Sequence, residues 1–471
     1  MHSKDMKVGI ATETKRNCQI SEGQCKKLLT VFILVFVYAL CMMSFIREIA
    51  VPYVYPFAID GHLPGDAQYY NALALKQLEA MNRLGMTAFQ LRPEGQGAAG
   101  IASIIYWVHD SVFGVVLTNS LLHATSTLIL VLILRQYFSN RISLISVIPL
   151  ALSPYMMLWF SQVNKETYSL LGILLFVYGI STFIKPRLNI GKILYSLCFL
   201  LVGIGLICIV RPYLNRLLLP PTTLILLFAL LYRLKTRRPI KELVGFILAS
   251  VLVLLSLNAF NSGAASDETI ARIAAGGEPA GNVETLHTVA QTCLQNTGLK
   301  NWLDEPLLPR YVNTQLRGIM TQRCLVFTLL NSQTNPVTQY AIIHRDILPA
   351  GSLEALRYLP YAIMIGIFSP WPAQWLYGVI EQHSIFYLIA SLEAFALYVG
   401  LIGIILYLID YRRFELSGLL VLAFSSMTII GMATPYIGAV YRYRYPWWIL
   451  IICIGAAATF TLFQERQIRE P

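Results

Sequence analysis

Leu28–Ile46, LLTVFILVFVYALCMMSFI, is the stretch that decides the fold, because it is apolar throughout and contains no charged residue. A hydrocarbon core about 30 Å thick needs roughly 20 apolar residues for one helical crossing. The run is therefore long enough to span a membrane. No small-residue cleavage site follows it, so we interpret it as a retained anchor and not as a cleaved signal peptide.

Runs of the same kind recur along the chain, which has 471 residues, is 56% hydrophobic and only 13% charged, and has a mean hydropathy of +0.60. These values exclude a water-soluble domain. Tyr358–Phe368 is apolar over only about half the length of a crossing, and we interpret it as re-entrant or interfacial. Ten runs are predicted to cross: Leu28–Ile46, Val115–Leu134, Ile142–Phe160, Thr167–Ile184, Ile193–Val210, Arg216–Tyr232, Leu243–Ala259, Ile385–Ile409, Leu416–Pro435 and Trp447–Phe463. The prediction is an all-α polytopic membrane protein.

The formal net charge of +11 follows the topology. Basic clusters occur in the N-terminal tail, in alternate connections and at the C-terminus, as the positive-inside rule requires when both termini are cytoplasmic. This distribution argues against a nucleic-acid partner. The predicted division is a cytoplasmic basic tail (residues 1–27), a transmembrane catalytic module (28–259) with a first outer loop (47–114), an extracytoplasmic cap segment (260–357), a C-terminal transmembrane module (358–463) and a cytoplasmic tail (464–471).

The first outer loop contains Leu63–Leu84, LPGDAQYYNALALKQLEAMNRL, whose apolar residues recur at helical spacing. Asp66 stands at the predicted start of this helix, where it can act as a general base for a reaction held by the membrane scaffold. It can equally be only a helix cap. Asp60 is the second catalytic candidate, and it can equally be a turn residue. Tyr69 and Tyr70, which follow Asp66, are candidates for substrate binding, and so is Glu166.

Basic residues gather on the same predicted outer side. Arginine binds phosphate bidentately, so cations at headgroup depth can hold a lipid phosphate. For any single one, snorkelling to headgroups or pairing with a nearby acid is an alternative; Lys165 and Glu166 in particular can form an ion pair that closes a turn. The basic candidates are Arg92, Lys165, Arg211, Arg216, Arg357, Arg442 and Arg444.

Other polar groups favour structural roles. His123 and Glu393 lie within apolar runs and are expected to have buried partners. Trp447 and Trp448 are interpreted as interfacial belt residues. Cys293 and Cys324 fall in the predicted outer segment, where they are either a disulfide or two unpaired thiols. No cysteine has metal-site spacing, and no glycine-rich phosphate loop opens on the cytoplasmic side, so neither a metal nor another cofactor is expected.

Five short motifs, in this order and on one predicted side, resemble the GT-C class of integral-membrane glycosyltransferases, in the branch similar to protein mannosyltransferases and lipid A aminoarabinose transferases. They are Gly65-Asp66-Ala67-Gln68-Tyr69-Tyr70, Arg92-Pro93-Glu94-Gly95, Asn164-Lys165-Glu166, Arg211-Pro212-Tyr213 and Arg442-Tyr443-Arg444-Tyr445-Pro446.

The resemblance implies that Asp66 acts as base or orients the acceptor. It implies that Lys165, Arg211, Arg442 and Arg444 hold the phosphate of a polyprenyl-phosphate sugar. The expected activity is transfer of a hexosyl or pentosyl unit to an envelope glycan, lipid or protein, with inversion, and without metal. The resemblance and the compact loops favour a bacterial inner membrane with the site facing outward. An envelope polysaccharide polymerase or ligase is the alternative enzyme. A transporter or flippase would place polar sites near the midplane instead.

Overall fold

The structure, a computed structural model, describes residues 22–54, 58–63, 65–109, 111–185, 189–259, 297–331, 343, 347–372, 385–411 and 414–469. Within these ranges the chain is helical, and extended backbone pairs only at two single bridges, Ile59 with His62 and Leu303 with Gly351. The predicted all-α class is thereby confirmed.

Nine helical segments in the described ranges are long and apolar enough to cross a membrane. They are Gly23–Val54, Phe113–Leu134, Glu166–Phe183, Ile190–Val210, Tyr213–Lys235, Ile240–Ala259, Leu388–Tyr411, Glu415–Ala433 and Ile437–Gln467. A tenth crossing is formed if the pair Asn140–Leu152 and Pro154–Phe160, bent by 58°, counts as one broken span. The ten predicted crossings correspond to these segments.

The helices of the first half begin with α2 (Glu22–Phe45), whose span continues through η1 (Ile46–Ala50) and α3 (Val51–Val54). The first connection holds α4 (Asp66–Leu84), η2 (Gly85–Ala88), η3 (Pro93–Gly95) and α5 (Gly97–Val108). There follow α6 (Phe113–Leu134), α7 (Asn140–Ile145), α8 (Ile148–Leu152), α9 (Pro154–Phe160), α10 (Glu166–Phe183), α11 (Ile190–Val210), α12 (Tyr213–Lys235) and α13 (Ile240–Ala259).

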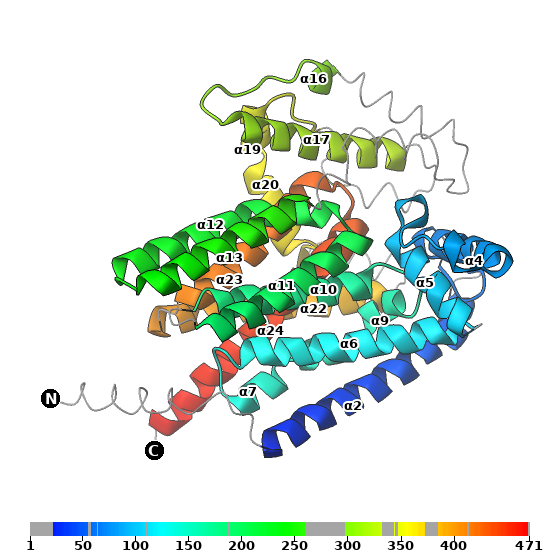
Figure 1. Ribbon diagram of the computed structural model, residues 1–471, viewed down its shortest axis with the longest axis horizontal. Coiled ribbons are helices and arrows are strands. Elements are labelled where there is room, and N and C mark those ends of the chain that lie inside the picture. Colours follow the sequence, from blue (N-terminus) through cyan, green and yellow to red (C-terminus); the bar gives the residue numbers. More distant parts are fainter. Residues whose placement is uncertain are drawn as a thin grey trace.

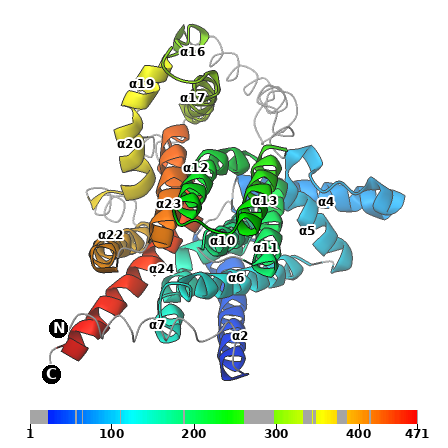
Figure 2. The same ribbon diagram turned by 60° about the vertical axis from the view of Figure 1, so that its left-hand side comes forward.

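The second half begins with the described helices of the predicted cap segment, α16 (Thr297–Lys300), α17 (Arg310–Asn331) and α19 (Ser352–Arg357). It continues with α20 (Leu359–Ile363), η4 (Met364–Phe368), α22 (Ile385–Tyr411), α23 (Phe414–Ala433) and α24 (Ile437–Arg469). Figure 2 shows α17 and α19 stacked beyond α20 and away from α10 and α6. The predicted domain boundaries stay predictions, and residues 260–296 lie outside the described ranges.

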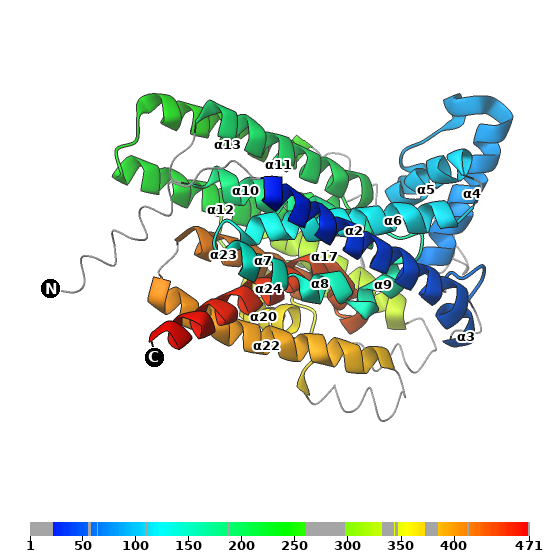
Figure 3. The same ribbon diagram turned by 90° about the horizontal axis from the view of Figure 1, so that it is seen from below.

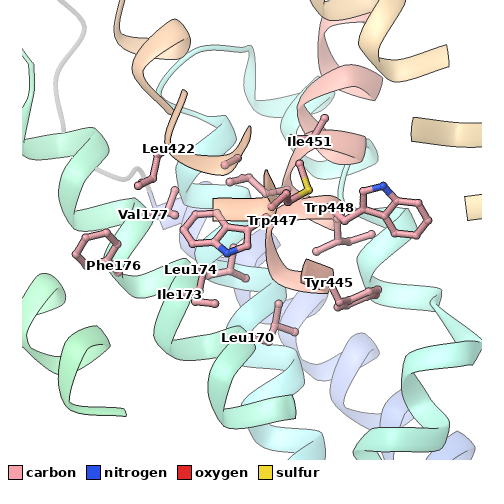
Figure 4. Close-up of a cluster of buried hydrophobic side chains, with 14 of the residues drawn as sticks. Leu170, Ile173, Leu174, Phe176, Val177, Leu422, Tyr445, Trp447, Trp448 and Ile451 are labelled. Atoms are coloured by element: carbon pink, nitrogen blue, oxygen red, sulfur yellow. The ribbon is translucent and has the colours of Figure 1, made fainter. Parts of the chain in front are cut away.

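α10 forms the centre of the bundle, since 89% of the apolar span Glu166–Phe183 is buried inside the protein. Figure 4 shows its side chains Leu170, Leu174 and Val177 beside Trp447 of α24. Trp447 and Trp448 are 1% and 0% exposed. The prediction that they form an interfacial belt was wrong. α24 begins at Ile437, ten residues before Trp447, so both tryptophans lie well inside the helix, where their side chains pack in the protein core.

Glycine lets two helix pairs approach backbone to backbone. A Cβ on Gly203 of α11 would lie 2.6 Å from the Gly172 carbonyl oxygen of α10, and a Cβ on Gly455 of α24 would collide with Gly400 of α22. Inside a membrane the lipid is as apolar as the side chains, so close packing and interhelical hydrogen bonds hold helices together. Substitution of these glycines would therefore push the paired spans apart.

The apolar piece at residues 358–368 is too short to cross, as predicted. It folds as α20 and η4, and its buried face, which includes Ala362 and Ile365, packs against α23. Cys324 of α17 is disulfide-bonded, while its predicted partner Cys293 lies outside the described residues.

One end of the bundle gathers the motifs. Figures 1 and 3 show α4, α5 and α9 together at the end that α24 runs away from as it leads toward the C-terminus. The α9–α10 turn and the α11–α12 junction reach this same end, which we call the Asp66 end. Its predicted outward orientation stays a prediction.

Candidate functional site

Asp66 is the first residue of α4, preceded by Gly65 at the N-cap position with φ 94° and ψ −130°, which favours glycine. The Asp66 carboxylate makes no capping bond. It accepts instead from the Arg442 guanidinium, with 3.1 Å between Oδ2 and the nitrogen, and its side chain is 48% exposed. The interpretation of Asp66 as a capping residue was therefore wrong.

The turn between α9 and α10 is fixed from two sides. The Asn119 side-chain nitrogen on α6 donates to the Phe160 carbonyl at 2.8 Å and to the Gln162 carbonyl at 3.1 Å. The Gln162 side chain accepts from the Leu63 backbone N–H at 3.1 Å. These bonds hold the Asn164-Lys165-Glu166 motif against the segment that leads into α4.

Glu166 begins α10 and is buried, with 1% of its side chain exposed. One oxygen, Oε1, accepts from Arg211 at 2.7 Å and from Arg442 at 2.6 to 2.7 Å. A buried carboxylate is costly unless paired, and breaking such a pair costs about 3–5 kcal/mol. Glu166 therefore reduces the repulsion between two neighbouring guanidiniums.

Arg442 reaches from the first turns of α24 to three acceptors. Besides Glu166 and Asp66 it donates to the Asn164 side-chain oxygen at 3.3 Å. Its guanidinium carbon lies 4.2 Å from the Trp159 ring centre on α9. Guanidinium stacking on an aromatic face and forked donation are properties that lysine lacks. Arg442 thus joins the first connection, the α9–α10 turn and the last helix.

The two ion pairs of Arg442 differ in strength. The Glu166 pair is buried, whereas the Asp66 pair is half open to solvent and worth about 0–1 kcal/mol. Asp66 can therefore leave Arg442 at small cost, and Glu166 cannot. Of the two carboxylates, Asp66 is the one available to take a proton.

Arg211 ends α11, and its guanidinium carbon lies 4.8 Å from the Tyr443 ring centre. Lys165 lies beside it with Nζ 4.7 Å from the Tyr70 ring centre. Burial, and to a smaller extent Arg211 and Arg442, lowers the pKa of Lys165 to about 8, although Asp66 and Glu166 act in the opposite direction. Within the described part of the chain no acceptor atom pairs with this ammonium. We call Asp66, Asn164, Lys165, Glu166, Arg211 and Arg442 the Arg442 cluster.

The other candidates lie apart from the Arg442 cluster. The Tyr69 hydroxyl donates to Glu94 Oε2 at 3.0 Å, and burial raises the Tyr69 pKa to about 12. Arg92 donates to the Gly95 carbonyl at 3.1 Å. Asp60 has φ 50° in the turn between Ile59 and His62, and its carbonyl accepts from Arg47. Of the candidates Tyr69 and Tyr70, Tyr70 contacts the cluster, through Lys165.

Arg444 has a different environment from Arg442. It is fully buried and donates to the Ile365 and Gly366 carbonyls at 3.2 and 2.8 Å, and to both the carbonyl and the hydroxyl of Ser369. Its guanidinium carbon lies 4.5 Å from the Trp448 ring centre. We call these contacts the Arg444 pocket. The structure does not bring Arg444 together with the other basic candidates. Arg357 adds no contact to them either, and the side chain of Arg216 lies outside the described part of the chain.

Sequence reasoning assigned no role to Trp159 or to Tyr443, the rings beneath Arg442 and Arg211. Both lie in aromatic-rich runs where no spacing singles them out. His123 and Glu393 have partners as predicted: His123 contacts the Ala151 carbonyl at 3.4 Å, and Glu393 accepts from Ser153 and Tyr441. No group of three or more His, Cys, Asp or Glu gathers among the described residues.

No curated protein and no solved structure showed significant similarity to the chain. Residues 98–257 match the family model for dolichyl-phosphate-mannose-protein mannosyltransferases. The matched segment runs from α5 to α13 and contains Asn164, Lys165, Glu166 and Arg211, while Asp66 and Arg442 lie outside it. This match confirms the resemblance indicated by the motifs, and with the membrane-spanning helices it supports a membrane glycosyltransferase of the GT-C type.

Proposed function

We propose that the chain transfers a sugar from a polyprenyl-phosphate donor to an envelope glycan, lipid or protein acceptor on the extracytoplasmic face of a bacterial inner membrane. The observation that carries the proposal is the Arg442 cluster. Residues separated by up to 376 positions meet there through direct hydrogen bonds, and the cluster combines a half-exposed carboxylate with three cations. That combination suits a reaction in which one group loses a proton while another gains negative charge.

The charge of the cluster favours a phosphate monoanion. Lys165, Arg211 and Arg442 carry three positive charges, and Asp66 and Glu166 carry two negative ones, so one positive charge is left over. A sugar joined to a polyprenyl phosphate is a phosphodiester with a single negative charge and balances it. A pyrophosphate-linked donor, which a polysaccharide polymerase or ligase would use, carries two. This balance favours the monophosphate donor.

The chemistry needs few groups. The acceptor oxygen attacks the anomeric carbon, the bond from that carbon to the phosphate oxygen breaks, and the acceptor proton passes to Asp66. Lys165 and Arg442 stabilise the charge that develops on the departing phosphate. A single displacement from the opposite face inverts the anomeric configuration. NMR of the product linkage measures that outcome, and a retained configuration would contradict it.

The first test compares sugar transfer in membranes containing the wild type, Asp66→Asn and Lys165→Ala at matched protein levels. Removal of a general base or of a phosphate cation is expected to lower transfer about 100-fold or more, with accumulation of the lipid-linked sugar. Glu79→Gln on the exposed face of α4 and Lys192→Ala at the start of α11 are the matched controls, and both should keep wild-type transfer.

Two outcomes would overturn the proposal. If Asp66→Asn keeps its envelope glycans unchanged, Asp66 is not the base and Asp60 must be tested next. If the wild type transfers no sugar and binds no polyprenyl phosphate, the transferase function itself is wrong. A metal-independent reaction is also predicted, and transfer should persist in excess chelator.

A further inference from the structure

Glu393 is a partly buried carboxyl group that the proposed reaction does not use. It lies on α22 within the span Leu388–Tyr411. Its two oxygens accept from different elements: Oε1 from the Ser153 hydroxyl at 2.7 Å, and Oε2 from the Tyr441 hydroxyl. An ionisable group within a span is costly and requires either partners or a role. Each oxygen of Glu393 has a partner, so the question is what these two hydrogen bonds do for the rest of the protein.

Ser153 stands at the break between α8 and α9, where the chain bends by 58° and Pro154 begins the new helix. At a break of this kind the helical hydrogen bonds do not continue across the bend. The orientation of α9 therefore depends on its contacts with other elements, and those of its first residues are among them. The Ser153–Glu393 bond ties that position to α22.

α9 carries two rings that support the start of α24. Tyr155 packs edge-on against Tyr441, with ring centres 4.7 Å apart, and Trp159 lies beneath the Arg442 guanidinium. Tyr441 also contacts Trp448 edge-on at 5.1 Å. Two consecutive residues of α24, Tyr441 and Arg442, thus rest on one short helix.

We propose that Glu393 is a positioning residue for Arg442, and this inference rests on the proposed function. By accepting from Ser153 and Tyr441 at once, the carboxyl group fixes α9 relative to the first turns of α24. This position of α9 relative to α24 places Arg442 over Trp159 and within reach of Asn164 and Glu166. Glu393 touches none of the groups of the Arg442 cluster and acts only through the residue next to Arg442.

The competing explanation is that Glu393 only stabilises the fold. A purely structural role predicts that variants lose thermal stability while the folded molecules bind donor normally. The positioning role predicts a loss of donor affinity in the folded molecules, and it predicts that this loss depends on Arg442. The two explanations therefore differ in a double-mutant cycle.

The experiment measures equilibrium binding of a polyprenyl phosphate to the purified full-length chain in detergent, with thermal unfolding followed in parallel. Glu393→Leu, which removes both acceptors, should weaken binding about tenfold, and Glu393→Gln, which keeps one amide oxygen, should weaken it less. In an Arg442→Ala background, Glu393→Leu should cause no further loss.

Gln136→Leu is the matched control, because Gln136 also joins separate elements, donating to Ser181 at 2.9 Å and Thr182 at 3.2 Å. It should lower thermal stability and leave binding unchanged. Equal losses from Glu393→Leu with and without Arg442, or a loss of stability alone, would overturn the positioning role. A wild type that binds no polyprenyl phosphate would instead contradict the proposed function.

Discussion

Arg442 and Arg444 stand two residues apart on α24, yet their surroundings share almost nothing. Arg442 pairs with the half-exposed carboxylate of Asp66 and the buried one of Glu166, whereas Arg444 is enclosed by the carbonyls of η4 and Ser369. Carbonyl groups accept from the terminal nitrogens of Arg444 without supplying negative charge. The comparison teaches that two arginines half a turn apart at a helix end can have different roles: one contributes charge to a candidate site, and the other holds the backbone of a neighbouring helix.

The largest expected effect comes from Arg442→Ala. Transfer should fall about 100- to 1000-fold, because the departing phosphate loses a preorganised donor and Asp66 loses its partner. The measurement is the rate of transfer at saturating donor, with Arg444→Met at matched folded protein as the comparison. If both variants lose transfer equally, the conclusion that the Arg442 cluster and the Arg444 pocket have different roles is wrong.

Lys165 gives an effect of intermediate size that depends on pH. Its pKa of about 8 means that the ammonium is charged below this pH and loses its proton as pH rises through it. Donor affinity should therefore fall up to about tenfold between about pH 7 and pH 10, since a charged hydrogen bond is lost. Lys165→Arg should remove this decline, because arginine stays charged.

The contribution of Lys165 to folding changes with pH in the opposite direction to donor binding, so a loss of binding at high pH can be distinguished from unfolding. Burial lowers the Lys165 pKa from 10.5 to about 8, so between these values the unfolded chain binds more protons at this site than the folded chain. Lys165 by itself then makes folding more favourable as pH rises through that window. Binding measured by titration calorimetry should weaken in the same window, and an unchanged affinity for the wild type would contradict the phosphate role.

The smallest expected effect on transfer comes from Arg444→Met. The folded variant should bind donor with wild-type affinity, but its free energy of unfolding should fall by about 1–3 kcal/mol, because buried carbonyls lose their donors. Thermal unfolding and donor binding, measured on one preparation, check this prediction. A weakened affinity with unchanged stability would assign Arg444 to phosphate binding and unite the two regions.

Much of the fold could be predicted from the sequence, because spanning length and apolar composition are properties of single segments. The ten crossings and the short piece at 358–368 follow from them. The position of Trp447 and Trp448 could not, since the number of helical turns before them depends on where α24 begins.

The candidate site was predictable in its residue types and less so in its pairing. The order of the motifs placed Asp66, Lys165, Glu166, Arg211 and Arg442 at one end, and their contacts then followed from helix packing. Nothing local distinguishes Arg442 from Arg444, because the acceptors of Arg444 are backbone carbonyls, which every sequence supplies. The left-handed conformation of Gly65, which leaves Asp66 without a capping bond, also depends on the path of the whole first connection.

The bond between Asp66 and Arg442 joins residues 376 positions apart, from the first connection and the last helix. At roughly 5–20 residues per second, a ribosome needs on the order of 20 to 75 seconds to proceed from one to the other. During that time the nascent chain already holds its first helices in the membrane but has no complete cluster. A chain halted before its last span is therefore expected to be inert, so unfinished translation products should not draw on the pool of lipid-linked sugar.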